Sequence, residues 1–170
     1  MQHETLPPAQ LSRELREETS PDLRRRRWAI GLSFAGSAIG MIVGAYQTGI
    51  LKRLPDIAPG RLFDAEKVDA SDYAYQRLQT PDALLMTVTY GLTAALAGAG
   101  GKDRARQNPA LPIAAAAKAG YDLATALRLG REEWAENKAL CSWCQVATLI
   151  SAATLALSLP EAVRAVRAAA

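Results

Sequence analysis

Residues 28–51 read WAIGLSFAGSAIGMIVGAYQTGIL and contain no Asp, Glu, Lys or Arg. A helix needs about 20 apolar residues to cross the hydrocarbon core of a bilayer, so this segment is long enough to span one. Four arginines, Arg24 to Arg27, precede it directly. The segment is about twice as long as the apolar region of a cleavable signal peptide, and no small-residue cleavage motif follows it. We therefore expect a retained membrane helix.

Three other segments extend this pattern. Residues 83–101 and residues 139–160 also lack charged side chains. A further span is expected at residues 109–127, although it carries Lys118 and Asp122. One charge at mid-membrane costs roughly 2.5–3.5 kcal/mol, but residues four apart share a helix face. We expect a structural ion pair turned toward the other helices, with a role in proton transfer as the alternative.

The composition of the whole chain is misleading when it is averaged. Its 170 residues are 49% apolar and 22% charged, and the mean hydropathy is −0.03. These values exclude a disordered polymer, a collagen-like chain and a disulfide-dense miniprotein. They also resemble those of a soluble protein, but the charges are confined to segments between the apolar windows.

The sequence therefore predicts an all-α integral membrane protein, a four-helix bundle. Basic residues are in modest excess on the side that holds the arginine cluster, so both termini are expected to be cytoplasmic. An arginine cluster beside anionic lipid accounts for the pI of about 9.0 without nucleic acid. The predicted parts are a polar, Arg-rich arm (1–27), helices at about 28–51, 83–101, 109–127 and 139–160, an outer loop (52–82) and a tail (161–170).

Two short helices are expected outside the spans. One runs along the surface from Ala9 to Glu18, and Pro21 is expected to interrupt the chain before the arginines. The other lies in the outer loop between Asp64 and Gln79, with Tyr73 and Tyr75 near the membrane interface.

Glycines recur every four residues in the first apolar segment, at Gly36, Gly40 and Gly44. Small residues at this spacing let a neighbouring helix approach closely. The stripe is either a packing surface within the chain, which we favour, or a homodimer face.

The two cysteines of the chain form one motif, Cys141-Ser142-Trp143-Cys144. Thiols three residues apart can close a small disulfide or act as a dithiol. Cys141 is expected in the first turn of the last span, where the helix dipole favours a thiolate. In the predicted orientation this turn lies at the outer face, where disulfides persist.

Metal binding is the main competing interpretation of this motif. A structural zinc site uses four ligands, whereas the chain offers no second cysteine pair and a single histidine, His3. A purely structural disulfide would close a very short loop and add little stability. The residues thus favour a redox site without a metal.

The four predicted spans, the long outer loop after the first, and the segment from Lys138 to Cys144 resemble the vitamin K epoxide reductase family, including its bacterial members. The resemblance covers roughly residues 28–160. It implies a membrane thiol–disulfide oxidoreductase that passes electrons from thiols to a quinone of the ubiquinone or menaquinone class. It also implies an exported, thioredoxin-like partner and a place in the bacterial inner membrane.

The resemblance assigns roles to individual residues. Cys144 would face the quinone and Cys141 would exchange disulfides. Thr148 stands where some members have a quinone-binding tyrosine, and Trp143 is a second candidate quinone contact.

Two features depart from the family. Members that run a full relay have a second cysteine pair in the first outer loop, and residues 52–82 contain no cysteine. A quinone-binding Asn near the second span is replaced by the segment Thr80-Pro81-Asp82. Two hypotheses follow: a quinone-coupled oxidoreductase, or a redox-inactive membrane scaffold or partner-binding protein on the same fold.

Overall fold

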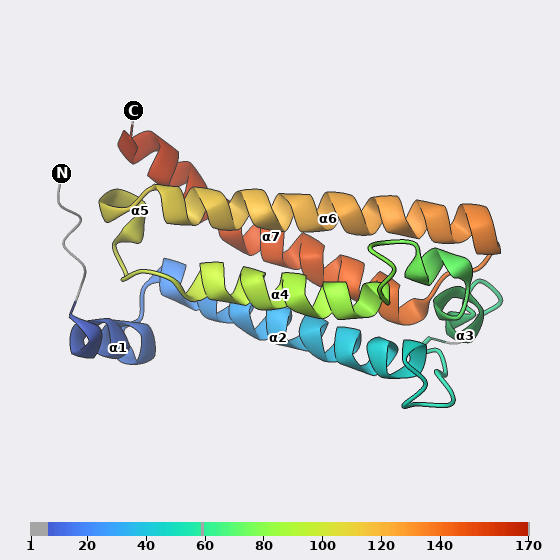
Figure 1. Cartoon of the computed structure of the whole chain (residues 1–170). Coiled ribbons are helices and arrows are strands. Elements are labelled where there is room, and N and C mark those ends of the chain that lie inside the picture. Colours follow the sequence, from blue (N-terminus) through green and yellow to red (C-terminus); the bar gives the residue numbers. More distant parts are fainter. Residues whose placement is uncertain (1–6, 59, 170) are drawn as a thin grey trace.

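The computed structural model describes residues 7–58 and 60–169, and His3 lies outside them. Over these residues the protein is helical and has no strand, only an isolated parallel bridge between Phe63 and Leu140 (Figure 1). The helices are α1 (Pro8–Glu17), α2 (Pro21–Gln47), α3 (Ala65–Asp69), the 3₁₀ turn η1 (Asp72–Tyr75), α4 (Asp82–Gly98), α5 (Arg104–Gln107), α6 (Ala110–Asn137) and α7 (Ser142–Ala169).

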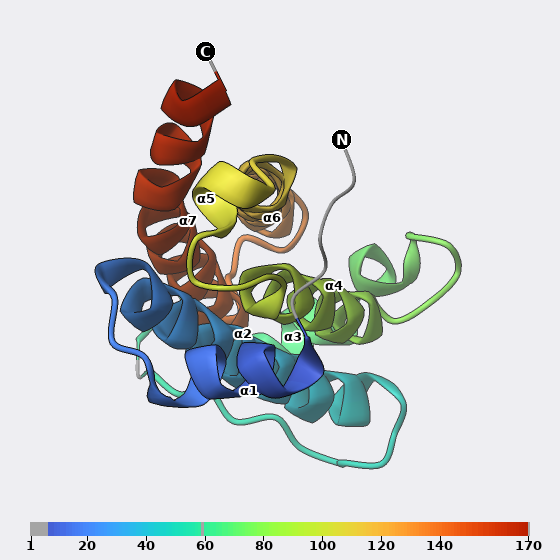
Figure 2. The same cartoon turned by 90° about the vertical axis from the view of Figure 1, so that its left-hand side faces the viewer.

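The four long helices, α2, α4, α6 and α7, pack side by side. Helix α2 contacts both α4 and α7, α6 packs closely on α7, and the contact between α4 and α6 is sparser (Figure 2). Helices α1 and α5 lie at one end of this array, which we call the arginine end; α3 and η1 lie at the other, the cysteine end (Figure 1). Both ends of the described chain lie at the arginine end.

The glycine stripe of α2 packs against α4. A Cβ atom at Gly36 would lie 2.6 Å from the Tyr90 ring, and one at Gly40 would lie 2.9 Å from the Ala83 carbonyl oxygen. Since carbon atoms cannot approach that closely, only glycine permits this helix contact. The prediction of a packing surface within the chain is confirmed.

Helix α2 begins before the arginine cluster. The Ser20 hydroxyl accepts a hydrogen bond from the Leu23 N–H at 3.1 Å, and Pro21 occupies the first turn. This is a favourable N-cap, because proline has no N–H and the first-turn amides lack partners in the helix. The expectation that Pro21 interrupts the chain is wrong, because here proline starts the helix.

Two other helices are longer than their apolar windows. Helix α6 continues to Asn137. The outer loop packs on the added part of the helix, where the Tyr73 hydroxyl donates a hydrogen bond of 2.9 Å to the Leu129 carbonyl. Helix α7 continues through Pro160 to Ala169. Tyr73 is 2% exposed, so its ring lies in the core of the protein.

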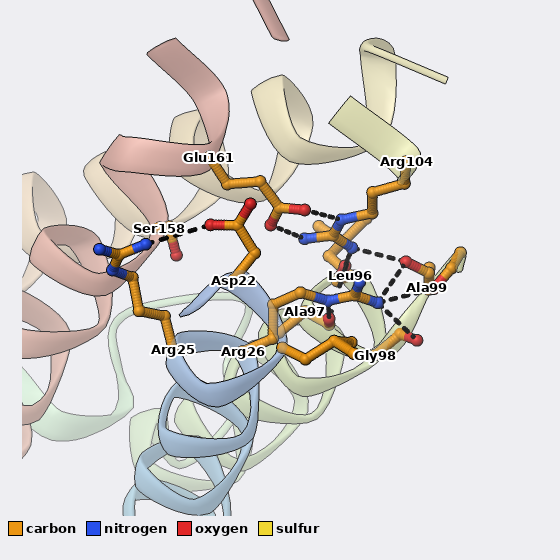
Figure 3. Close-up of polar contacts among 12 residues, drawn as sticks. Asp22, Arg25, Arg26, Leu96, Ala97, Gly98, Ala99, Arg104, Ser158 and Glu161 are labelled. Carbon is orange, nitrogen blue, oxygen red and sulfur yellow. Dashed lines mark hydrogen bonds and ion pairs between the residues drawn. The ribbon is translucent and has the colours of Figure 1, made fainter. Parts of the chain in front are cut away.

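Buried charges hold the arginine end together (Figure 3). Arg26 donates hydrogen bonds of 2.7–3.3 Å to five successive carbonyl groups after Leu96, at the carboxyl end of α4. Arg104 forms a two-pronged ion pair with Glu161, at 2.9 and 2.8 Å. Arg26 therefore caps a helix and is not free to contact lipid headgroups, and the Arg104–Glu161 pair ties α7 to α5 directly after Pro160.

Two helices, α2 and α7, are long and apolar enough to cross a membrane; α4 is apolar but shorter. Only 39% and 33% of the apolar windows of α2 and α7 are buried. The core helix of a soluble protein would be mostly buried, so their exposed apolar side chains fit a lipid surround. Examples are Phe34 and Leu149, which are 63% and 69% exposed.

Replacing Gly40 by alanine tests the α2–α4 contact. The added methyl group collides with the α4 backbone, so we expect Gly40→Ala to lower the free energy of unfolding by about 1–3 kcal/mol. Gly31 is the matched control in the same helix, because a Cβ there meets nothing within 4 Å. Gly31→Ala should leave stability unchanged or raise it slightly. Equal effects of the two changes in a denaturation experiment would contradict this packing.

Candidate functional site at the cysteine end

The turn between α6 and α7 places the two cysteines. Lys138 adopts a left-handed conformation (φ 53°) that ends α6. Cys141 then caps α7: its carbonyl accepts the Gln145 N–H at 3.1 Å, and its sulfur accepts the Cys144 N–H at 3.3 Å. Cys141 therefore precedes the first turn of α7, one position earlier than expected. Hydrogen bonds from the Cys144 side chain and amide favour negative charge on the Cys141 sulfur, but burial and the neighbouring Asp69 raise the pKa of this thiol above its usual value. The expectation that the helix start makes Cys141 a thiolate is therefore not met in the reduced protein.

The outer loop covers this turn. The Asp56 carboxylate accepts the Ser142 hydroxyl at 2.7 Å and the Ser142 N–H at 3.2 Å through one oxygen, and the Ala65 N–H at 2.9 Å through the other. Leu140 exchanges backbone hydrogen bonds with the same loop. Beneath these contacts Cys141 is 0% exposed.

Trp143 also belongs to this covering layer. Its indole N–H donates to the Pro55 carbonyl at 3.0 Å. The side chain therefore faces the outer loop and lies apart from the cavity described next.

An apolar cavity of about 260 Å³ lies between α4, α6 and α7. Cys144 and Thr148 line it from α7, whereas Cys141 does not. Tyr121 lines it from α6 and is 66% exposed, so the cavity reaches the outer surface between α4 and α6, where these helices contact each other least. The pair is thus divided: Cys141 lies beneath the loop and Cys144 lies at the cavity.

The exposed walls of this cavity are mostly apolar, although charged residues such as Arg77 and Glu133 also line it, and several of its polar groups are bonded to neighbouring groups. The Tyr90 hydroxyl donates to the Ala147 carbonyl at 2.6 Å and lies 2.9 Å from the Ser151 hydroxyl. The Thr148 hydroxyl donates to the Cys144 carbonyl at 2.9 Å. Asp82, from the segment that replaces the family's Asn, also lines the cavity and accepts a hydrogen bond from Gln47 at 2.8 Å. Apolar walls with a few polar groups are typical of small-molecule sites.

Lys118 and Asp122 form the ion pair that their spacing suggests. The Lys118 ammonium lies 2.6 and 2.7 Å from the two Asp122 oxygens, and the Thr93 hydroxyl donates to Asp122 at 2.8 Å. The pair links α6 to α4, and Asp122 lines the cavity.

Two carboxyl groups that sequence reasoning missed lie beside the cysteines. Glu133, which is 3% exposed, accepts the Cys141 N–H at 3.3 Å. Asp69, on α3, is 2% exposed. Burial raises the pKa of Asp69 to about 7, interaction with the Cys141 thiol lowers it, and the charges of Asp82 and Asp56 raise it. Asp69 therefore titrates near neutrality, unlike an exposed aspartate.

The Asp69 carboxylate and both sulfurs lie within 4.8 Å of one another. Both cysteines are free thiols in this structure. Three ligand atoms are one fewer than a structural zinc site uses, and a bound cation and a disulfide exclude each other at the same sulfurs. We assign no metal to this group.

The fold and the site together define a class of protein. It is a helical protein with lipid-compatible apolar surfaces, in which one cysteine of a dithiol lies beneath a covering loop and the other lies at an apolar cavity. Residues 27–159 match the family model described as the Vitamin K epoxide reductase family, and the chain belongs to this family. Membership indicates a membrane thiol–disulfide oxidoreductase. The comparisons with curated proteins and with solved structures found no match.

Replacing Asp56 by alanine tests whether the loop controls access to Cys141. The change removes charged hydrogen bonds worth about 1.5–3 kcal/mol each, so the loop should open more often. In a Cys144→Ser background, we expect a water-soluble maleimide to label Cys141 about tenfold faster or more, since 1.4 kcal/mol corresponds to a factor of ten.

The matched control is Asp72→Ala, because Asp72 is an exposed aspartate of the same loop. It should leave the labelling rate unchanged. Equal rates for Asp56→Ala and the parent protein would show that the loop does not limit access.

Proposed function

We propose that this protein is a quinone-coupled thiol–disulfide oxidoreductase with Cys141 and Cys144 as its redox pair. The observation that carries the proposal is the apolar cavity against Cys144. A quinone headgroup is an apolar ring with polar oxygens, and a cavity of about 260 Å³ with mostly apolar walls and some polar groups fits such a ring with short substituents. The family resemblance supports the same cofactor class, ubiquinone or menaquinone.

Each residue at the site has its own role in the proposed reaction. When bound, the quinone accepts two electrons and two protons. Cys144 presents its sulfur to the cavity, while Cys141 is held at the N-terminus of α7 with a backbone amide on its sulfur. Thr148 and Tyr90 line the cavity on the α7 and α4 sides and position the ring. Trp143 supports the covering loop through Pro55 and has no contact with the cavity in this mechanism.

We further propose that the four long helices span the membrane as a four-helix bundle with both termini in the cytoplasm. The cysteine end then faces the outside of a bacterial inner membrane, where an exported thioredoxin-like protein could supply thiols. Because Cys141 is 0% exposed, that partner must displace the outer loop before it can reach the sulfur. Lys118 and Asp122 serve as a structural pair that neutralises both charges within the bundle.

The alternative is a redox-inactive membrane scaffold on the same fold. It is favoured by one observation: Cys141 is fully covered by a loop without cysteines. In that case Cys141→Ser and Cys144→Ser would leave the cellular role intact, whereas an oxidoreductase would lose its role with either change.

Filling the cavity tests the quinone proposal. We expect Ala126→Trp, on the α6 wall, to slow reoxidation of the reduced purified protein by a water-insoluble quinone at least tenfold, because the indole occupies the ring's place. Reoxidation by diamide, which does not need the cavity, should be unchanged. The rates are measured by trapping the remaining thiols at successive times.

The control is Ala124→Trp, which adds the same side chain at an exposed position of α6 outside the cavity lining. It should reoxidise at the wild-type rate. If the quinone oxidises Ala126→Trp as fast as Ala124→Trp, the cavity is not the quinone site.

A further inference from the structure

Asp69 stands out among the buried groups at the cysteine end. Gln47 donates a long hydrogen bond of 3.4 Å to its Oδ1 atom. Its Oδ2 atom is buried and has no hydrogen-bond partner among the described residues. Leaving such an atom unpaired costs about 1–3 kcal/mol or more, so its persistence in a folded protein calls for an explanation.

Its surroundings keep the carboxyl group ready to hold a proton. The pKa of about 7, raised by burial, means that both protonation states are populated near neutrality. Among the described residues, the groups around it are neutral or negative, and no cation stabilises the carboxylate directly. These groups are Gln47 and Tyr46 on α2, Asp56 in the outer loop, Tyr75 on η1, Asp82 on α4, Glu133 on α6, and Cys141 and Cys144 at the start of α7.

Cys141 needs a proton acceptor when it reacts. It is fully buried, so water cannot take its proton directly. The Cys144 amide favours a thiolate at this sulfur but accepts no proton. The Glu133 carboxylate oxygen Oε2 is already bonded to the Cys141 N–H, whereas Oδ2 of Asp69 is free and its carboxylate lies within 4.8 Å of the sulfur.

We infer that Asp69 exchanges a proton with Cys141: it takes the thiol proton when the disulfide closes and returns it when the disulfide opens. This inference rests on the proposed function and adds a proton-transfer residue to it.

The steps balance. When the disulfide closes, the Cys141 proton passes to Asp69 and the Cys141 thiolate bonds to the Cys144 sulfur. Two electrons pass to the quinone, together with the Cys144 proton and one proton from water.

When a donor dithiol opens the disulfide, one donor thiolate attacks Cys141. Cys144 leaves with the electron pair and takes one donor proton. The second donor thiolate attacks the donor sulfur bonded to Cys141. Cys141 then leaves with its electron pair and recovers the proton from Asp69, while the other donor proton goes to water.

The test is the pH profile of disulfide closure without quinone. Purified reduced protein in detergent is mixed with excess oxidised glutathione, and remaining thiols are trapped over time. We expect the wild-type rate to rise with pH through about 7, as Asp69 becomes able to accept a proton, and then to level off. Asp69→Asn should be slower by about 100-fold at neutral pH, the low end for a positioned general base, and should reach the wild-type rate only where thiols ionise unaided.

Three further variants separate proton transfer from packing. Asp69→Glu should restore the rise in closure rate near neutral pH. Asp72→Asn makes the same change at an exposed site and should keep this rise. Glu133→Gln should also keep it. The inference would be overturned if the closure rate of Asp69→Asn depended on pH as the wild-type rate does. It would also be overturned if only Glu133→Gln lost the rise in rate near neutral pH.

The wild-type protein provides a second test that needs no folded Asp69→Asn variant. With aspartate carboxyl carbons labelled with ¹³C, the infrared difference between reduced and oxidised protein should show a change in aspartate protonation near neutral pH. No such change at any pH would overturn the inference. Because glutathione replaces the quinone, a protein that ignores quinone would disprove the proposed function without deciding the role of Asp69.

Discussion

The carboxylate of Asp56 joins the outer loop to the first turn of α7, and the chemistry of the cysteine end depends on this contact. One oxygen bonds to Ser142, between the two cysteines, and the other holds the start of α3 at Ala65. Through α3 the same contact brings Asp69 to the sulfurs. If this link opens, Cys141 loses its cover.

This arrangement gives the two cysteines different surroundings. Cys144 lies against an apolar cavity that opens between α4 and α6, and Cys141 lies beneath a polar loop. In the proposed function, an electron acceptor dissolved in lipid reaches Cys144 through the cavity, and a donor dissolved in water reaches Cys141 once the loop moves. The family's relay members place cysteines in the loop, whereas this chain has Asp56 and Asp69 there. Movement of the loop takes the place of the relay in our account.

The sequence predicted the all-helical fold from its long uncharged windows, because a run of about 20 apolar residues is typical of a long helix. It missed the helix ends, since residues 128–137 and 161–169 carry charged side chains and lie outside the uncharged windows. The start of the second segment is held by a tertiary contact, the Arg104–Glu161 ion pair. The Cys141–Cys144 pair was visible from its spacing alone. Asp69 was not, because an aspartate in a loop gains significance only when α3 folds back beneath α7.

The most direct test of the central claim is the redox state of the pair in intact membranes. Thiols are trapped with a reagent that shifts the protein's mass, once with the quinone pool oxidised and once with quinone synthesis blocked. We predict a Cys141–Cys144 disulfide in the first case and two free thiols in the second. The same redox state in both membranes would contradict quinone coupling and leave the membrane scaffold as the better account.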